Sequence, residues 1–266
     1  MAQEKWMIEG EKIIDIETIR TLKLGLIAGQ VNIVGHDEPG ARVEVHSVRG
    51  KPLKVSIDGD TLEIDHPQLS WDNFIDVFKS FVGSASADVS IMVPRDVELK
   101  FGVVSATALV SGLTNNARIS TVSGDVVVDN HHGDLELNAV SGEIAVRNHH
   151  GKISAHSVSG DITATGEITK FVSDGVSGDV FLDLTGTPDE VRINTVAGDV
   201  TTRLEPRVPA QYSINTLTGR LQLDDSEITG VRGTYRGKFG VLDEHWLEFK
   251  ANTVSGNVSV LHSVTA

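Results

Sequence analysis

Apolar residues recur along this chain in a fixed pattern around a short tetrad centred on glycine. The tetrad Val-Ser-Gly-Asp/Glu has its glycines at positions 124, 142, 160 and 178, which are 18 residues apart. Related tetrads place glycines at 198, 219 and 256, and Ala106 holds the same position one period upstream. Counted from the glycine, positions −7, −5, −2, +2 and +4 are apolar in nearly every copy. The same template fits the N-terminal region around Gly29, with Leu22, Leu24, Ile27, Val31 and Ile33.

Spacing by two residues is the periodicity of a β-strand, and the change of parity around the glycine marks a corner between two strands. One pair of short strands cannot close a core, but stacked pairs can, at a spacing of about 4.8 Å. Because every copy keeps the same phase, the pattern predicts an all-β fold, a parallel β-solenoid-like stack of 18-residue rungs. An antiparallel sandwich with a recurring turn motif is the alternative.

The residues of the corner have predicted structural roles. Glycine indicates either a positive φ or a close approach of two backbones, and Ala106 indicates that its own rung does not need a positive φ. We expect Ser at position −1 to form a hydrogen-bonded ladder along the stack. We expect the same of Asn at position −4, which is present as Asn138, Asn194, Asn215 and Asn252.

The region before the repeats predicts further strands and one helix. Asp58-Gly59-Asp60 lies between two alternating apolar segments and predicts a hairpin. A short helix is expected near 72–83, because Phe74, Val77, Phe78 and Phe81 share one helical face. This helix either covers open strand edges or contacts a membrane or a partner. We therefore expect an N-terminal β segment with a capping helix over residues 1–93, continuous with a repeat domain over residues 94–266.

Composition narrows the classes of function. The formal net charge is −14, with 37 acidic and 23 basic residues, which argues against nucleic-acid binding. The absence of cysteine excludes disulfides, cysteine-ligated zinc and a cysteine nucleophile. We see neither a secretory signal nor an apolar segment long enough for an integral membrane span. The expected location is cytoplasmic, or peripheral to the cell envelope.

An acidic residue follows the glycine on five successive rungs. Stacking would place these carboxylates about 4.8 Å apart, where neighbours repel one another by about 1 kcal/mol in water. One hypothesis is that this acidic ladder binds a cation, calcium in particular. The alternative is that each side chain accepts a hydrogen bond from a turn amide and faces solvent. The ladder consists of Asp125, Glu143, Asp161, Asp179 and Asp199.

Two Asn-His-His-Gly turns, again 18 residues apart, form a second candidate site. Stacking would bring four imidazoles together, and neutral imidazole is a good ligand for zinc, nickel or copper. Adjacent residues of an extended chain point in opposite directions, so only one histidine of each pair is expected to face its neighbour. A polar turn without metal is the alternative. The four candidate ligands are His131, His132, His149 and His150.

We predict no catalytic residues and no cofactor. Carboxylates on adjacent rungs do reproduce the spacing of about 5 Å in retaining glycosidases. The stacking itself imposes that spacing, however, so it says nothing about catalysis. The rungs also carry few aromatic residues, and no nucleophile motif accompanies the many serines.

The tandem Val-Ser-Gly-Asp repeats, the opening Leu22–Ile33 and the segment Pro94-Arg95-Asp96-Val97 together resemble the bacterial toast-rack family. The resemblance covers residues 15–262 and implies β-strand-repeat domains of unknown function, described as "putative adhesins". We therefore expect a non-enzymatic scaffold or interaction module of the adhesin type, linked to the cell envelope. The alternative is a metal- or glycan-binding protein that uses the histidine or acidic ladder. The partner would be a protein or a glycan, and self-association through open strand edges is a further expectation.

Overall fold

The computed structural model describes residues 4–66, 85–228 and 233–263. Within these ranges the chain is all-β, with 24 strands, and contains no helix that could span a membrane. The short helix predicted near 72–83 lies outside the described residues. The chain divides into two compact units, Met1–Gly133 (unit 1) and Asp134–Ala266 (unit 2), and each is described by itself. The boundary predicted between residues 93 and 94 stays a prediction.

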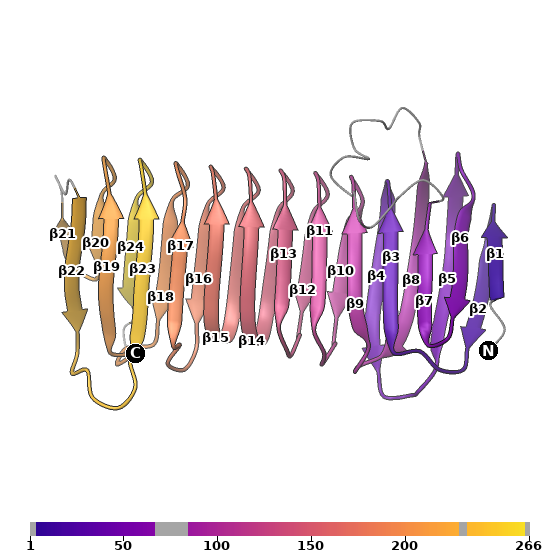
Figure 1. Ribbon diagram of the computed structural model, residues 1–266, viewed down its shortest axis with the longest axis horizontal. Coiled ribbons are helices and arrows are strands. Elements are labelled where there is room, and N and C mark those ends of the chain that lie inside the picture. Colours follow the sequence, from indigo (N-terminus) through magenta and orange to yellow (C-terminus); the bar gives the residue numbers. More distant parts are fainter. Residues whose placement is uncertain (1–3, 67–84, 229–232, 264–266) are drawn as a thin grey trace. The chain divides into compact units, whose positions relative to one another are not determined.

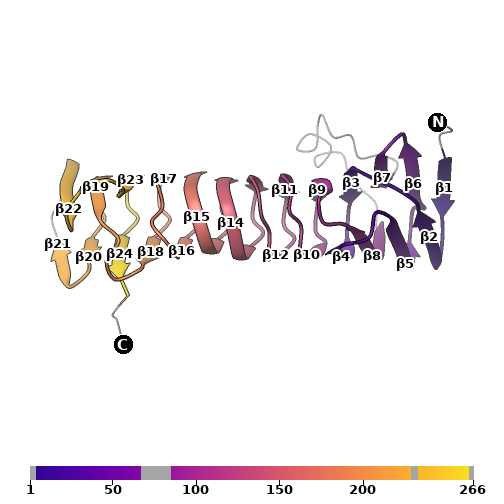
Figure 2. The same cartoon turned by 90° about the horizontal axis from the view of Figure 1, so that it is seen from below.

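Unit 1 consists of two rows of hydrogen-bonded strands (Figures 1 and 2). Row 1a contains, in spatial order, β1 (Glu4–Ile8), β6 (Leu53–Asp58), β7 (Thr61–Asp65), β3 (Thr21–Leu26), β9 (Glu98–Val103) and β11 (Ala117–Thr121). Row 1b contains β2 (Lys12–Ile16), β5 (Ala41–Arg49), β8 (Ser86–Pro94), β4 (Gly29–His36), β10 (Thr107–Ser111) and β12 (Val126–Asp129). Pairing is parallel from β7 onward in row 1a and from β8 onward in row 1b, and antiparallel before that.

Unit 2 also has two rows. Row 2a contains β13 (Leu135–Ala139), the C-terminal halves of β14 (Ile144–Ser157) and β15 (Ile162–Gly175), then β17 (Glu190–Asn194), β23 (Leu247–Thr253), β19 (Ala210–Thr216) and β22 (Gly233–Phe239). Row 2b contains the N-terminal halves of β14 and β15, then β16 (Val180–Leu184), β18 (Val200–Leu204), β24 (Val258–His262), β20 (Leu221–Leu223) and β21 (Ser226–Ile228). Only the final strands, β22 and β21, pair antiparallel.

The predicted stacking is confirmed inside each unit. Residues at the same template position are register partners, as Leu22 and Leu99 are in row 1a and Ile144 and Ile162 are in row 2b. Alternate side chains along most strands are buried, and the buried faces of the two rows form the core of the unit. The hairpin at residues 58–60 is also confirmed, with Gly59 at φ +65° joining β6 to β7.

The rungs of unit 2 do not stack in the order of the sequence. The rung formed by β23 and β24 contains Gly256 and is the last in the chain. It lies between the rung of β17 and β18 and the rung of β19 and β20. Figure 1 shows β23, in yellow, between the two orange strands β17 and β19. The final rung is therefore interior, and the stack ends at β22 and β21.

The corner positions require glycine because the backbones of neighbouring rungs lie very close together there. None of the six described here, Gly124, Gly160, Gly178, Gly198, Gly219 and Gly256, has a positive φ. A Cβ at any of them would lie 2.0–2.2 Å from a carbonyl oxygen of the neighbouring rung. The two backbones thus approach too closely for a side chain at these six corners, whereas Gly29 combines a close approach with a φ of +118°.

One apolar template position, −2, contributes to the core in unit 1, where Ile27 and Val122 are buried, but contributes little in most rungs of unit 2. In five rungs of unit 2 its side chains lie outside the corner and are about half exposed, from 46% at Val254 to 59% at Leu217. Position −3 points inward instead, and there a Thr or Ser hydroxyl accepts a hydrogen bond from the glycine N–H. Examples are Ser157 with Gly160 at 2.9 Å and Thr253 with Gly256 at 2.8 Å. The turn is thereby closed from within the core.

The predicted serine ladder is present in both units, and the predicted asparagine ladder is present in part in unit 2. Ser at −1 donates to the carbonyl of residue −2 in the preceding rung, as Ser123 does to Val104 and Ser159 to Val140. Asn252 Nδ2 donates to Asn194 Oδ1 at 2.7 Å, which extends the asparagine ladder across two rungs. These bonds connect rungs outside the core and add to the main-chain pairing.

Gly175 occupies position −3 of the Gly178 corner and lacks the hydroxyl that Ser157 and Thr195 supply in the adjacent rungs. Gly175→Thr is expected to raise the free energy of unfolding by about 1 kcal/mol, because it adds a hydrogen bond to Gly178 N–H. A Cβ at Gly175 finds only ordinary contacts, the nearest at 3.4 Å. Urea denaturation measures the effect, with Gly175→Val as the control that adds bulk without a hydroxyl. Equal stability of the two variants would contradict the assigned role.

A buried histidine makes the stability of unit 1 dependent on pH. His66 follows β7 and is fully buried, and among residues 4–66, 85–228 and 233–263 neither ring nitrogen has a hydrogen-bond partner. Burial, with a smaller contribution from Lys51, lowers the pKa of His66 to about 4. The unfolded state takes up the proton first, so stability is lost as the pH falls from about 6.5 to about 4. Urea denaturation across this range should show a shallower loss for His66→Leu, and equal slopes would contradict the assignment.

Candidate functional site

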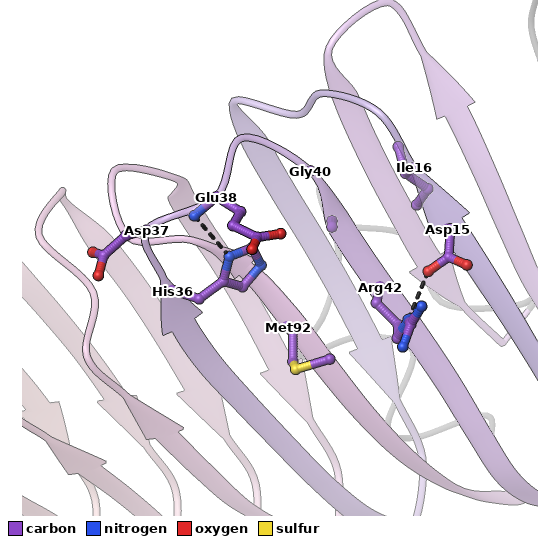
Figure 3. A pocket seen from close by; sticks show the side chains of 9 residues that line it. Asp15, Ile16, His36, Asp37, Glu38, Gly40, Arg42 and Met92 are labelled. Atoms are coloured by element: carbon purple, nitrogen blue, oxygen red, sulfur yellow. Dashed lines mark hydrogen bonds and ion pairs between the residues drawn. The ribbon is translucent and has the colours of Figure 1, made fainter.

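Row 1b carries a hollow at the end where β4 leads into β5 (Figure 3). Arg42 Nε donates to Asp15 Oδ1 at 2.6 Å, and this pair lowers the pKa of Asp15 and raises that of Arg42. Glu38 N–H donates to His36 Nδ1 at 3.0 Å, which holds the turn. Figure 3 shows the Glu38 carboxyl group above the His36 ring. The hollow is lined by Asp15, Ile16, His36, Asp37, Glu38, Gly40, Ala41, Arg42 and Met92.

Arg95, which does not line the hollow, holds the loop that carries Asp37 in place. Arg95 Nε donates to Asp37 Oδ1 at 2.7 Å, and Arg95 also donates to the carbonyl of Gly112. Asp37 is thereby neutralised, and Figure 3 shows it directed away from Arg42. Asp15 is matched by Arg42, so the carboxylate of Glu38 gives the hollow its net negative charge.

Four exposed apolar side chains lie on the outer side of row 1b, and one of them, Met92, lines the hollow. Ile13 on β2, Val34 on β4, Met92 on β8 and Leu109 on β10 are 62%, 42%, 40% and 38% exposed. Val34 is the register partner of Met92, and Met92 is the register partner of Arg42. Val34 and Met92 therefore lie in one row across the strands with the Arg42–Asp15 ion pair. We call these outward side chains of row 1b, with the hollow, the row 1b face.

A second hollow lies on the same face, between β2 and β5. It is lined by Glu11, Lys12, Ile13, Glu44, Val45 and His46. His46 Nε2 is 2.8 Å from the Ser90 hydroxyl, which ties this hollow to β8. The row 1b face therefore combines two shallow depressions with aliphatic and acidic side chains.

The acidic ladder connects rungs through main-chain hydrogen bonds. Asp161 Oδ1 accepts from Asp179 N–H, and Asp179 Oδ1 accepts from Asp199 N–H, both at 2.8 Å. Asp199 in turn accepts from the backbone and side-chain amides of Asn257. All five ladder residues are exposed, Asp125 in unit 1 and the other four in unit 2. This geometry matches the turn-amide alternative, and cation binding stays a prediction.

The two histidine turns belong to different units. His131 in unit 1 and His149 in unit 2 are buried, whereas His132 and His150 are exposed, as expected for adjacent residues. Burial lowers the pKa of His131. His150 Nε2 lies 3.1 Å from the Glu167 carboxylate. In the part of the chain that the structure describes, no group of three or more His, Asp or Glu side chains could hold a metal ion.

The family of this chain follows from a match between its sequence and one family profile. The profile of the Toastrack DUF4097 family matches residues 21–261, which is most of the chain. The chain belongs to the Toastrack DUF4097 family. This confirms the resemblance carried by the repeats. No curated protein matches the sequence.

The solved structures to which this chain is similar include three proteins. A "putative cell adhesion protein" from Clostridium sporogenes ATCC 15579 is 14% identical, with 98% of this chain and 100% of that chain covered and a TM-score of 0.30. A "putative adhesin" from Bacteroides fragilis NCTC 9343 is 10% identical, with 95% and 99% covered and a TM-score of 0.44. A "putative adhesin" from Parabacteroides merdae ATCC 43184 is 13% identical, with 97% and 96% covered and a TM-score of 0.33.

The row 1b face of this Toastrack chain was not among the sites predicted from the sequence. A signal for it does exist in the pattern. Strands of row 1b carry apolar residues at two consecutive positions, one buried and one exposed, as in Ile13-Ile14, Ile33-Val34 and Ile91-Met92. A half-buried strand with one solvated face alternates apolar and polar residues, so each such doublet marks an outward apolar side chain.

Proposed function

We propose that this protein is a non-enzymatic interaction module of the adhesin-like type, and that the row 1b face binds a protein segment with basic and apolar side chains. The observation that carries the proposal is the row 1b face itself. Four large apolar side chains are exposed there, and two of them, Ile13 and Met92, line the two hollows. Exposed apolar side chains gathered on one face and bordered by polar residues are typical of interaction sites.

Charge supports the choice of a basic partner. Five acidic residues line the two hollows, against the two basic residues Lys12 and Arg42, and the acidic ones are Glu11, Asp15, Asp37, Glu38 and Glu44. The whole chain carries a net charge of −14, which adds a long-range attraction for cations. Complementary charge raises the rate of encounter and the specificity, while the apolar side chains supply burial.

The test measures binding of a fluorescent peptide of alternating lysine and leucine by anisotropy. The double variants Met92→Ser/Leu109→Ser and Glu38→Gln/Glu44→Gln should each bind at least about fivefold more weakly than wild type, since they remove about 1 kcal/mol or more of burial or of charge attraction. The double variant Phe181→Ser/Asp183→Asn, on the outer face of row 2b, is the matched control and should bind as wild type does.

Equal binding by all variants would contradict the proposal, as would binding of an alternating glutamate–leucine peptide with the same affinity. Binding of a neutral oligosaccharide that competes with the basic peptide would instead favour a glycan partner. High salt should weaken the lysine–leucine interaction, because exposed charges are screened.

A further inference from the structure

We infer that the space between the rung of β17 and β18 and the rung of β19 and β20 is a strand-accepting site, and that a second copy of this chain can fill it with its residues 247–262. In the structure the chain's own β23 and β24 occupy this site. β23 pairs in parallel with β17 on one side and β19 on the other, and β24 pairs likewise with β18 and β20. The last rung of the chain is thus held on both sides by rungs that precede it.

The contacts define which segment the site accepts. Phe249 is fully buried and has Val191 and Tyr212 as register partners, with its ring 6.2 Å from that of Tyr212. Val258 is buried between Val200 and Leu221 in the second row. The site therefore takes a strand–turn–strand segment with apolar side chains at alternate positions of each strand.

The corner of the inserted segment must be glycine. A Cβ at Gly256 would lie 2.0 Å from the carbonyl oxygen of Gly198, and a Cβ at Gly219 would lie 2.0 Å from that of Gly256. Asn257 adds polar contacts, because its backbone N–H and its side-chain amide both donate to Asp199. Residues 247–262 meet each of these requirements, whichever copy of the chain supplies them.

A linker of seven residues, 240–246, joins β22 to β23. Its path determines whether residues 247–262 insert into the same copy of the chain or into a second copy. Phe239 at the end of β22 and Leu247 at the start of β23 are both register partners of Ala210, on opposite sides of β19. The linker must therefore pass around the start of β19 and span two strand spacings, about 9.6 Å. It does so with little burial, and Val241 within it is 78% exposed.

Exchange between two copies would preserve every contact of the inserted rung and change only the path of the linker. Such an exchange yields a two-fold dimer in which each copy completes the other. The balance between closed and exchanged forms then depends on the effective concentration that the linker provides, which is on the order of millimolar for a short flexible linker.

The first experiment shortens the linker by deleting Val241–His245. The three remaining Cα–Cα steps reach at most about 11 Å, which barely exceeds the straight distance of about 9.6 Å and leaves no length for the detour around the start of β19 within one copy. Light scattering coupled to gel filtration should show a monomer for the wild-type chain and at least a tenfold larger dimer fraction for the deletion variant. A folded monomer of the deletion variant would overturn the inference.

A second experiment keeps the natural linker and remains informative if the deletion variant fails to fold. Equal amounts of chains carrying Asn194→Cys and Asn252→Cys are unfolded together and refolded at about 1 mM, near the effective concentration of the linker. Asn194 and Asn252 are register partners, so exchanged dimers should contain a disulfide between the two chains. A mixture of Asn194→Cys and Gly10→Cys chains is the control. No dimer, or dimers without the inter-chain disulfide, would overturn the inference.

Discussion

Gly178→Ala is expected to destabilise unit 2 by about 2–3 kcal/mol, although it adds a single methyl group. The Cβ would lie 2.1 Å from the carbonyl oxygen of Gly160, and that oxygen belongs to the backbone of the neighbouring rung. The rungs would have to separate locally, which disturbs the main-chain bonds on both sides of the corner. Overpacking of a tightly packed interior carries a cost of this size.

Gly175→Ala is the matched control, three residues earlier in the same turn. A Cβ at Gly175 meets its nearest atom, the Ser157 carbonyl oxygen, at an ordinary 3.4 Å. Its effect should stay within about 0.5 kcal/mol, as for most substitutions that disturb no packed contact. Urea denaturation followed by circular dichroism measures both variants. Equal stabilities would show that the close approach at Gly178 is not what requires glycine.

Phe249→Ala is expected to cost about 3–5 kcal/mol, the usual cost of removing a fully buried phenylalanine side chain. Phe249 lies on β23 and is buried because a rung covers it on each side. If residues 247–262 formed the end of the stack, one side of Phe249 would lack a rung and its truncation would cost less. The predicted loss therefore depends on the interior position of the last rung.

The control for this substitution is Phe181→Ala on β16. Phe181 is the same residue type in the same unit, but it points to the outer face of row 2b and is only partly buried. Its truncation should cost about 1 kcal/mol, because less apolar surface is lost from a buried environment. The two variants are compared in the same urea series, and similar losses would contradict the interior placement of β23.

Much of the fold follows from the sequence, because each rung buries residues with strand periodicity and the glycine recurs in one phase. The order of the rungs could not be predicted in the same way. Residues 247–262 fit the template as well as any other copy, so periodicity alone does not choose between the end of the stack and an interior position. The antiparallel strands at the termini of the rows, such as β22, have no repeat that would reveal them.

The template also treated position −2 as equivalent to the buried positions. Val158 and Val176 are apolar, yet they lie outside the corner and are about half exposed, whereas Ser157 beside them is buried. Hydrophobicity alone does not show on which side of a sharp corner a residue lies. The Thr or Ser at −3, which closes the turn, was the sequence signal for that side.

The candidate sites were predicted less completely than the fold. His131 is buried and His132 is exposed, in line with the expectation that the two side chains of each pair diverge, and the metal site itself stays a prediction. The row 1b face was missed, because it brings together residues from β2, β4, β5 and β8, which are far apart in the chain and pair in an order that no repeat indicates. Only the doublets of apolar residues in these strands pointed to it.

The central claim, that the last rung lies inside the stack, is tested most directly by engineered disulfides, since the chain has no cysteine of its own. Asn252 is the register partner of both Asn194 and Asn215, so the double-cysteine variants at 194/252 and 215/252 should each form an intramolecular disulfide on oxidation. The variant at 194/215 should not, because its Cα atoms are two strand spacings apart, about 9.6 Å. Rapid disulfide formation at 194/215, with none at 194/252, would contradict this account.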